Sequence, residues 1–273
     1  MDIEFWGVRG TVPVSSLETS KYGGATNCAS VRAAGGDIII IIIDAGTGLK
    51  PLGDRLVKER KGPIKLHLLL THFHLDHIMG FPFFAPLWSR DTELIIYAPV
   101  PQADTEAALA GLMGGRYFPL SLSATAAAKS YRAVGKGTFA VGGFRVSACP
   151  LHHPQGSVAY KIEDTVRKIV FATDTEHPEL GVDIQLRDFC RGADLLVYDA
   201  TFTPEEYAAG KKGWGHSTWQ AGTRLAKEAG VKKLLLSHLN PDHSDSRVDM
   251  SVSLAKWEFP SVEAVRAGWK RTI

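Results

Sequence analysis

The sequence predicts a layered α/β fold, and two features of its pattern carry that prediction. Strands that are apolar along nearly their whole length alternate with helical segments, which is typical of sheets buried on both faces with helices outside. The chain of 273 residues is 45% hydrophobic and 22% charged, enough apolar material for a large core. Its 31 basic and 29 acidic residues balance, which excludes disorder as the main state. We expect residues 1–273 to form a single domain, because no linker or internal repeat interrupts them.

Runs of apolar residues predict the strands. The isoleucines of Ile38–Ile43 are too few for a membrane span and indicate a buried strand. Gly35-Gly36 predicts a hairpin that joins this strand to Cys28–Ala34. The other expected strands are Ile3–Val8, Ile64–Leu70, Glu93–Ala98, Phe144–Cys149, Val158–Ile162, Lys168–Thr173, Leu195–Tyr198 and Lys233–Ser237.

Helices are expected between these strands. Leu49–Lys61 follows the strand-breaking turn Asp44–Gly48, and Gly80–Leu87 follows a histidine-rich loop. The segment Met113–Lys129 is rich in Gly, Ser and Ala and gives no clear pattern. The remaining expected helices are Asp104–Leu112, Thr218–Ala229 and Asp245–Trp257.

Cysteine usage and charge favour a cytoplasmic protein. Cys28, Cys149 and Cys190 are isolated, form no CxxC pair, and are expected to be buried small hydrophobic residues. The residues Met1–Glu4 do not include a basic stretch followed by an apolar one, so we expect no secretory signal. The net charge of +2 provides no global attraction to nucleic acid or a membrane, so a phosphate-bearing partner must be held by a local site.

The strongest chemical signal is the segment Thr71–His77, directly after a buried strand. It carries four metal-ligating side chains, His72, His74, Asp76 and His77. Imidazole and carboxylate are ligands that Zn²⁺ and similar ions bind. A solvated histidine-rich turn is the alternative, and the apolar residues on both sides argue against it.

Further metal ligands are expected at the ends of later strands, because one loop cannot complete two coordination spheres. His152-His153, Asp174 and His238 each follow an apolar run. Strands would deliver these side chains to one edge of a sheet, where loops commonly carry functional sites.

The order of these residues resembles the metallo-β-lactamase superfamily along nearly the whole chain. The motif is His72-x-His74-x-Asp76-His77, followed by His153, Asp174 and His238. The resemblance implies an αβ/βα sandwich, with two sheets packed face to face, helices outside, and the metal site at one edge. Asp44–Gly48 is similar to the turn that supports the histidine loop in this family.

Within the superfamily, the residues resemble the phosphodiesterase-like branch. Redox di-iron members carry Glu in place of His74, and the β-lactamases usually carry Cys in place of Asp174. Asp199–Phe202 and Gly215–Thr218 resemble paired motifs of tRNase Z and of cyclic-nucleotide phosphodiesterases. The first of these motifs usually opens with Glu in tRNase Z, which leaves the role of Asp199 less certain.

RNA is the less favoured partner. Phe5–Val14 and Tyr22–Cys28 resemble a bacterial group of phosphodiesterase-like metallo-hydrolases whose substrates are mostly unassigned. The basic arm with which tRNase Z grips tRNA is not visible, and Met113–Lys129 in its place has two basic residues, Arg116 and Lys129. Nucleic-acid affinity rests largely on phosphate neutralisation by such residues.

The resemblance implies two divalent metal ions about 3.5 Å apart. Zn is the expected metal, and Mn and Fe are the alternatives. His72, His74 and His153 would hold the first ion. Asp76, His77 and His238 would hold the second, with Asp174 bridging both.

The same resemblance implies the catalytic roles. Asp76, His216 and Asp199 are the expected catalytic residues. A hydroxide between the metals would attack phosphorus, and His216 would protonate the leaving alkoxide while Asp199 orients its ring.

We therefore expect a cytoplasmic, homodimeric, metal-dependent phosphodiesterase acting on a small nucleotide diester, such as a 3′,5′-cyclic nucleotide. An RNA 3′-processing nuclease is the first alternative, and a lactone, thioester or lactam hydrolase is the second. A non-catalytic metal-binding protein fits poorly with the full ligand set.

Several polar and aromatic residues keep two interpretations. His152 is expected at the surface, His177 at the periphery, and His67 in the core. His243 fits either a pocket mouth or the start of a helix. Lys211-Lys212 fits a phosphate contact or a solvated turn, and Trp214 fits base stacking or packing.

Overall fold

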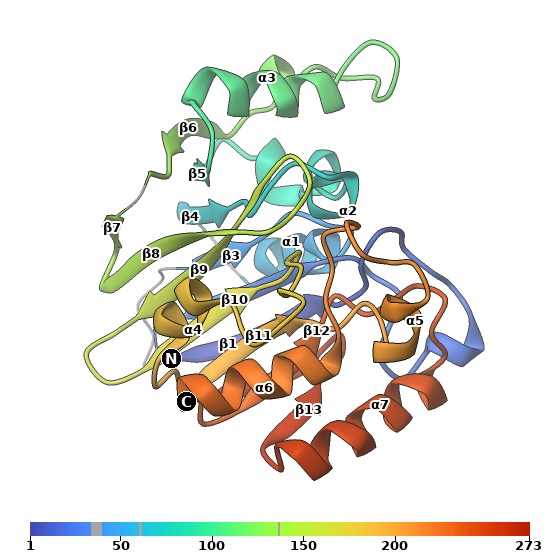
Figure 1. Ribbon diagram of the computed structural model, residues 1–273. Helices are drawn as coiled ribbons and strands as arrows, with labels where there is room; N and C mark the ends of the chain where they lie inside the picture. The colour runs from blue at the N-terminus through green and yellow to red at the C-terminus, as the bar shows by residue number, and fades with distance from the viewer. Residues whose placement is uncertain (34–39, 60–61, 136) are drawn as a thin grey trace. The chain divides into compact units, whose positions relative to one another are not determined.

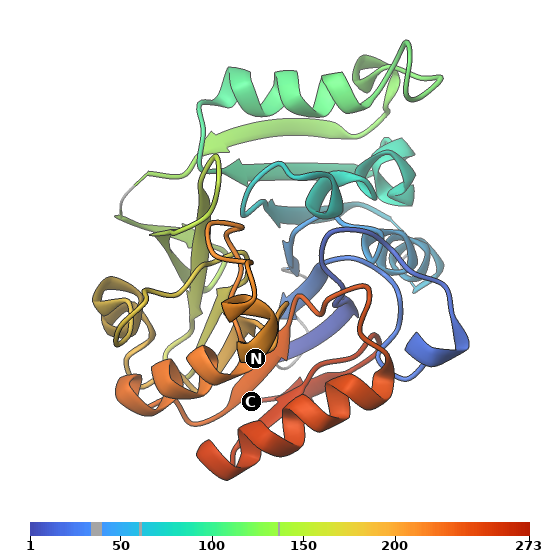
Figure 2. The same ribbon diagram turned by 45° about the vertical axis from the view of Figure 1, so that its right-hand side comes forward.

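Two seven-stranded sheets organise the chain, one in each of two units (Figures 1 and 2). This computed structural model describes residues 1–33, 40–59, 62–135 and 137–273. Unit 1 comprises residues 1–7, 25–135 and 267–272, and unit 2 comprises residues 8–24, 136–266 and 273. The predicted α/β class, with two sheets and helices, is confirmed.

The sheet of unit 1 has the strand order β14-β1-β2-β3-β4-β5-β6. Neighbouring strands from β3 to β6 are parallel, whereas β14, β1, β2 and β3 pair antiparallel. The isoleucines of β3 are all buried, as expected for a central strand with neighbours on both sides. The strands are β1 Asp2–Gly7, β2 Cys28–Arg32, β3 Ile40–Ile43, β4 Ile64–Leu69, β5 Thr92–Ala98, β6 Ala128–Ala133 and β14 Lys270–Thr272.

The register of unit 1 places the histidine loop beside the Asp44 turn. β3 and β4 run parallel with Ile43 opposite Leu69, so both strands end at the same edge of the sheet. The antiparallel pairing of β2 with β3 agrees with the predicted hairpin, although Gly35-Gly36 itself lies outside the described residues.

Helices of unit 1 form where the apolar positions recur at helical spacing. α1 Leu49–Glu59 buries Leu49, Leu52 and Leu56 in the core of this unit. α3 Gln102–Leu112 lies along β6 in both views (Figures 1 and 2). α2 Leu75–Ile78 is a single turn that begins inside the histidine loop.

The predicted helix Gly80–Leu87 is wrong. The segment forms two short 3₁₀ turns, Phe81–Phe83 and Ala85–Trp88. Pro82 and Pro86 explain the difference, because each proline lacks a backbone N–H and its ring clashes with the preceding turn of an α-helix. Another 3₁₀ turn, Leu122–Ala124, lies in Met113–Lys129, for which no element was predicted.

The sheet of unit 2 has the strand order β13-β12-β11-β10-β9-β8-β7. β10, β11, β12 and β13 are parallel, and β7 to β10 are antiparallel. Four neighbouring parallel strands therefore end at one edge, where loops gather. The strands are β7 Gly137–Val141, β8 Phe144–Leu151, β9 Ser157–Glu163, β10 Lys168–Ala172, β11 Leu195–Asp199, β12 Leu234–Ser237 and β13 Val262–Ala264.

Helices of unit 2 begin at side-chain caps. Thr218 Oγ1 accepts a hydrogen bond from Ala221 N at the start of α6, and Ser244 caps α7 in the same way through Arg247 N. α6 and α7 lie side by side in both views (Figures 1 and 2). The helices are α4 Ile184–Cys190, α5 Pro204–Ala208, α6 Trp219–Ala229 and α7 Asp245–Glu258, with a 3₁₀ turn at Leu17–Thr19.

Two further sequence predictions concern the core and the membrane. Cys28, Cys149 and Cys190 are all buried and free, as expected. Among the described residues, no helix is both long and apolar enough to cross a membrane.

Candidate metal and catalytic centre

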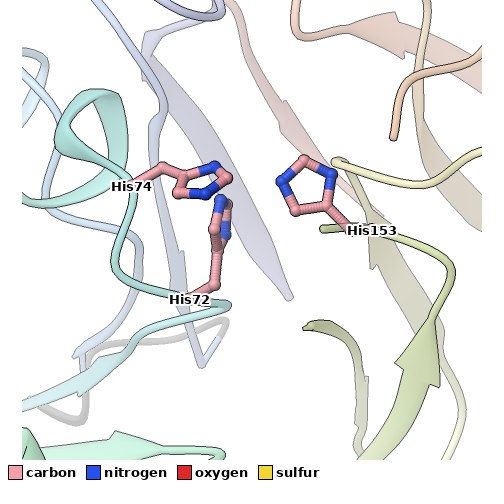
Figure 3. A group of neighbouring side chains, drawn as sticks. All are labelled: His72, His74 and His153. Carbon is pink, nitrogen blue, oxygen red and sulfur yellow. The ribbon is translucent and has the colours of Figure 1, made fainter. Parts of the chain in front are cut away.

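The histidine loop of unit 1 turns sharply at the end of β4 and brings its imidazoles together. His74 precedes α2, and His77 N donates to the His74 carbonyl at 3.0 Å. The ring centroids of His72 and His74 are 4.5 Å apart, and those of His72 and His77 are 4.3 Å apart. Figure 3 shows the rings of His72 and His74 projecting from this loop toward one another.

Asp44 holds this loop from the neighbouring strand end. Its carboxylate accepts hydrogen bonds from Thr71 N at 2.8 Å and from Thr71 Oγ1 at 3.0 Å. Its Oδ2 lies 2.8 Å from His77 Nδ1, and Ala45 N donates to the His77 carbonyl at 2.7 Å. The predicted support of the loop by the Asp44–Gly48 turn is confirmed.

In unit 2, the parallel strands deliver Asp174, Asp199 and His238 to one edge of the sheet. Asp199 is the last residue of β11, and its partner in register is Ser237, which precedes His238. One ligand atom from each of Asp174, Asp199, His216 and His238 lies within 4.8 Å of the others. The strand-end argument from sequence named two of these residues, Asp174 and His238, and both lie in this cluster.

The backbone is strained at three of the strand ends. Asp44, Asp174 and His238 have φ of 59°, 58° and 53°, in the left-handed region. Such a conformation costs on the order of 1 kcal/mol for a residue with a side chain, and it clusters at functional sites. The side chains of all three residues are buried, so packing and hydrogen bonds stabilise the strained backbone conformation.

Asp199 orients His216. His216 Nδ1 lies 2.9 Å from Asp199 Oδ2, and Asp199 Oδ1 accepts from Thr201 N at 3.0 Å and Ser217 N at 3.1 Å. Burial raises the pKa of Asp199, but the charge and the hydrogen bond of His216 lower it by more than burial raises it. The pKa of Asp199 therefore lies below its ordinary value. An ionised Asp199 only accepts hydrogen bonds, and His216 therefore carries a proton on Nδ1.

His216 packs between two other histidines of unit 2. Its ring stacks on His238 at a centroid distance of 4.8 Å and meets His153 edge-on at 5.3 Å. His216 therefore lies among predicted metal ligands while its Nδ1 stays hydrogen-bonded to Asp199.

Hydrogen bonds fix the tautomer of four predicted ligands. The Asp44 carboxylate and the Gly215 carbonyl only accept, so His77 and His153 donate from Nδ1. Thr71 Oγ1 donates to Asp44 and lies 3.0 Å from His72 Nδ1. Thr201 Oγ1 donates to the His238 carbonyl and lies 2.8 Å from His238 Nδ1. In each neutral ring the lone pair is then on Nε2, which is the usual arrangement of metal-ligating histidines.

Two close approaches inside the units fit a shared cation. His77 Nε2 lies 3.2 Å from Asp76 Oδ2, and His238 Nε2 lies 3.1 Å from Asp174 Oδ1. A lone-pair nitrogen and a carboxylate oxygen repel at this distance unless a proton or a metal cation lies between them. The residues present therefore fit divalent metal ions, for which imidazole and carboxylate are suitable ligands.

Glu176 anchors the loop that carries His216, and sequence reasoning missed it. Its carboxylate accepts from Tyr207 Oη at 2.6 Å, from Gly213 N at 2.7 Å and from Gly215 N at 2.9 Å. These hydrogen bonds lower its pKa although burial raises it. The Gly215 carbonyl in turn accepts from His153 Nδ1 at 2.8 Å. No sequence motif indicates this role, because it depends on contacts between segments that are far apart in the chain.

Two glycines let the histidines approach the backbone. A Cβ at Gly10 would lie 2.1 Å from His238 Cε1. A Cβ at Gly215, whose φ is +80°, would lie 2.4 Å from His153 Nδ1. The N-terminal motif therefore contributes the surface against which His238 packs, a role that was not predicted for Gly10.

The other histidines lie outside the described ligand clusters. His152 has an exposed side chain 3.4 Å from Asp183, as expected for a surface group. His177 Nδ1 lies 2.8 Å from Ser217 Oγ. His243, which comes just before α7, has its Nε2 2.9 Å from Glu206 Oε1 in α5. His67 is buried with its Nδ1 3.2 Å from Tyr97 Oη, and its core assignment is confirmed.

We predict that Glu176→Gln lowers kcat about tenfold on a phosphodiester. The new amide group would face backbone N–H donors, and hydrogen bonds to a charged group are stronger than those to a neutral one. Gly215 would then hold His153 and His216 less firmly. Steady-state kinetics, with KM and metal content measured in parallel, check the result.

Glu179→Gln is the matched control, because Glu179 lies nearby but is exposed and paired with Lys212. Equal kcat values for the two variants would show that Glu176 does not position this loop for catalysis. A general loss of folding, seen by circular dichroism in Glu176→Gln alone, would assign it a purely structural role.

A known family model matches this chain over a large part of its length. The model is described as "Beta-lactamase superfamily domain", and it matches residues 40–239. The chain belongs to the β-lactamase superfamily. The predicted membership in the metallo-β-lactamase superfamily is confirmed, and so is its fold.

The curated relatives that resemble this chain are Ribonuclease Z proteins. It is 40% identical over 86 residues to the Ribonuclease Z of Brevibacillus brevis, a match that covers 32% of this chain and 25% of that protein. It is 26% identical over 263 residues to the Ribonuclease Z of Streptococcus suis, covering 77% of this chain and 84% of that protein. The first two matches thus span about a quarter of the relatives' own length.

Solved structures share the superfamily fold over almost all of the chain. The metallo-β-lactamase fold protein YhfI from Bacillus subtilis has a TM-score of 0.73 at 20% identity, covering 99% of this chain and 98% of that one. Human tRNase Z, short form, has a TM-score of 0.68 at 21% identity, covering 100% and 99%. A diphosphatase of the PhnP family has a TM-score of 0.70 at 17% identity, covering 99% and 96%.

Homologues such as the Ribonuclease Z proteins are hydrolases of this superfamily. The described residues include His and Asp clusters that could hold divalent metals, in agreement with the predicted metal-dependent hydrolase. The substrate and the identity of the metal are separate questions.

Proposed function

We propose that the chain is a phosphodiesterase that uses two divalent metal ions to hydrolyse a small nucleotide diester. The observation that carries the proposal is the Asp199–His216 pair beside Asp174 and His238 in unit 2. An imidazole that is oriented by a buried carboxylate next to metal ligands is suited to give a proton to a leaving oxygen. A 3′,5′-cyclic nucleotide is a substrate of this class.

The proposal requires that both units contribute ligands to one centre and act as a single domain, residues 1–273. His72, His74 and His153, drawn in Figure 3, would hold the first ion. Asp76, His77 and His238 would hold the second, and Asp174 would bridge the two ions. Zinc suits this ligand set best, and Mn or Fe would also bind it.

When bound, two such ions supply a water-derived nucleophile near neutral pH and neutralise charge on the phosphate oxygens. The residues of the chain perform the remaining tasks. Asp199 holds a proton on His216 Nδ1, and a second proton on Nε2 would pass to the leaving alkoxide. Asp44, Thr71, Thr201 and Gly215 keep the ligand rings in their orientation.

An RNA 3′-processing nuclease is the second candidate, because the curated relatives named above are Ribonuclease Z proteins. The basic residues of 113–129 argue against it. Lys129 Nζ donates to Thr125 Oγ1 at 2.6 Å and to the Ala127 carbonyl at 2.9 Å, and burial lowers its pKa. Arg116 is then the one exposed basic side chain of this segment, which offers little neutralisation of an RNA backbone.

A parallel assay tests the proposal. The metal-loaded protein is given cyclic AMP, cyclic GMP, bis-p-nitrophenyl phosphate, a precursor tRNA and a lactam. We expect turnover of the diesters above that of the tRNA and the lactam. Turnover of the lactam without any diester would overturn the proposal, and preferred cleavage of the tRNA would favour the nuclease. Light scattering of the same sample tests the expected homodimer.

A further inference from the structure

The loop that precedes His216 exposes an aromatic ring. Trp214 is 55% exposed, although a large aromatic side chain usually contributes more when it is buried. The loop around it is nonetheless firmly held, because Glu176 accepts hydrogen bonds from Gly213 N and Gly215 N on either side of it. A rigid loop that keeps an indole in water is typical of a binding surface.

The ring of Trp214 is connected to the catalytic pair and to a positive charge. Phe202 lies edge-on to Trp214 at a centroid distance of 6.4 Å and to His216 at 6.0 Å. Lys211 Nζ lies 3.8 Å from the centroid of the Trp214 ring, a cation–π contact. The indole is therefore one aromatic ring away from His216 and carries a cation beside it.

A pocket of unit 2 lies next to this loop. Its volume is about 530 Å³, within the range of small-molecule sites, and it is lined in part by His153, His177, Gly213 and Gly215. Gly213 and Gly215 flank Trp214 in the sequence, so the loop that carries the indole forms part of the pocket wall. His153 places a predicted metal ligand in its wall.

We propose that this pocket holds the nucleoside part of the substrate, with the base stacked on Trp214 and Lys211 beside the phosphate. The inference rests on the proposed phosphodiesterase function and adds a specificity-determining residue to it. Every nucleobase presents a flat face, so stacking on one indole favours nucleotides over other phosphate esters without selecting one base.

A pair of ligands that differ only in the base tests the stacking. AMP and ribose 5-phosphate are titrated into the metal-loaded protein, and binding is followed by calorimetry and by quenching of tryptophan fluorescence. We expect AMP to bind at least about fivefold more tightly, since a stacked base contributes roughly that much or more. In Trp214→Ala the difference should disappear, and Trp214→Phe should restore part of it.

Matched variants exclude general effects. Trp257 is 89% exposed at the end of α7, so Trp257→Ala should keep the full preference for AMP. Lys211→Ala should weaken binding of both ligands, whereas Lys212→Ala should not, because Lys212 is paired with Glu179 at 2.8 Å.

The outcomes separate this inference from the function on which it rests. Hydrolysis of cyclic AMP with an unchanged preference for AMP in Trp214→Ala would overturn the subsite and leave the phosphodiesterase intact. A preference for AMP that depends on Trp214, without hydrolysis of any diester, would support the subsite and overturn the function. Equal binding of AMP and ribose 5-phosphate to the unaltered protein would also overturn the subsite.

Discussion

Asp174→Asn is expected to abolish hydrolysis and to lower the affinity for metal by more than about 100-fold. Loss of a residue that only orients a ligand already costs 10- to 100-fold in affinity, and loss of a bridging carboxylate should cost more. Asparagine is the informative replacement because Asp174 has a φ of 58°. Asparagine tolerates this left-handed conformation, so the variant removes charge without adding backbone strain.

The fold should survive this substitution. The backbone of Asp174 is held by its N–H, which donates to Asp199 Oδ2 at 3.0 Å, and by its carbonyl, which accepts from Ser157 Oγ at 2.8 Å. Neither bond uses the Asp174 carboxylate. Removing a buried negative charge beside Asp199 also relieves repulsion in the metal-free protein, so the metal-free variant should melt no lower than the metal-free parent.

Elemental analysis after dialysis against a weak chelator measures the effect, with thermal melting of both forms in parallel. Asp91→Asn is the control, because Asp91 is exposed at the start of β5. Two ions per chain in Asp174→Asn, as in the control, would exclude Asp174 from the ligand set. The bimetallic assignment would then fail with it.

Most of the fold could be predicted because its central strands are chemically distinct. The isoleucines of β3 and the leucines of β12 are continuous apolar runs that suit a sheet interior. Edge strands were missed for the opposite reason. Most residues of β6 and β7 are exposed or half-buried, and the position of these strands is set by pairing with β5 and β8.

The candidate ligand residues could be identified because each lies shortly after a strand, where loops commonly carry functional sites. What the sequence could not supply is contact between segments far apart in the chain. Glu176 acts through Gly213 and Gly215, more than thirty residues away, and Gly10 acts through its contact with His238. Such roles depend on distances of a few ångströms that no local pattern encodes.

His216→Ala should lower kcat on a cyclic nucleotide by about 100- to 10,000-fold, the usual contribution of a general acid, while the protein keeps its metal. His216 Nδ1 is held by Asp199, and the ring lies between His153 and His238. Truncation at His216 leaves in place the Gly215 carbonyl and Thr201 Oγ1, which orient those two rings. Asp199→Ala would be less informative, because Asp199 also accepts bonds from Thr201 N and Ser217 N.

The leaving group decides between proton donation and metal binding. The alkoxide released from a cyclic nucleotide needs a proton, whereas p-nitrophenolate leaves readily as an anion. A general acid at His216 therefore predicts a large loss on cyclic AMP and a small loss on bis-p-nitrophenyl phosphate for the same variant. A metal ligand at His216 predicts equal losses on both substrates together with loss of metal, since Asp174, Asp199, His216 and His238 form one cluster.

His67→Gln is the control for the replacement of a histidine, because His67 is a buried residue of β4 whose Nδ1 lies 3.2 Å from Tyr97 Oη, outside the ligand clusters and the pocket. It should leave both activities unchanged. Equal losses on the two substrates in His216→Ala, with full metal content, would show that His216 binds substrate rather than donating a proton. In that case the proton must come from another group, and the pairing of Asp199 with His216 would serve to hold the substrate phosphate next to the metal ligands.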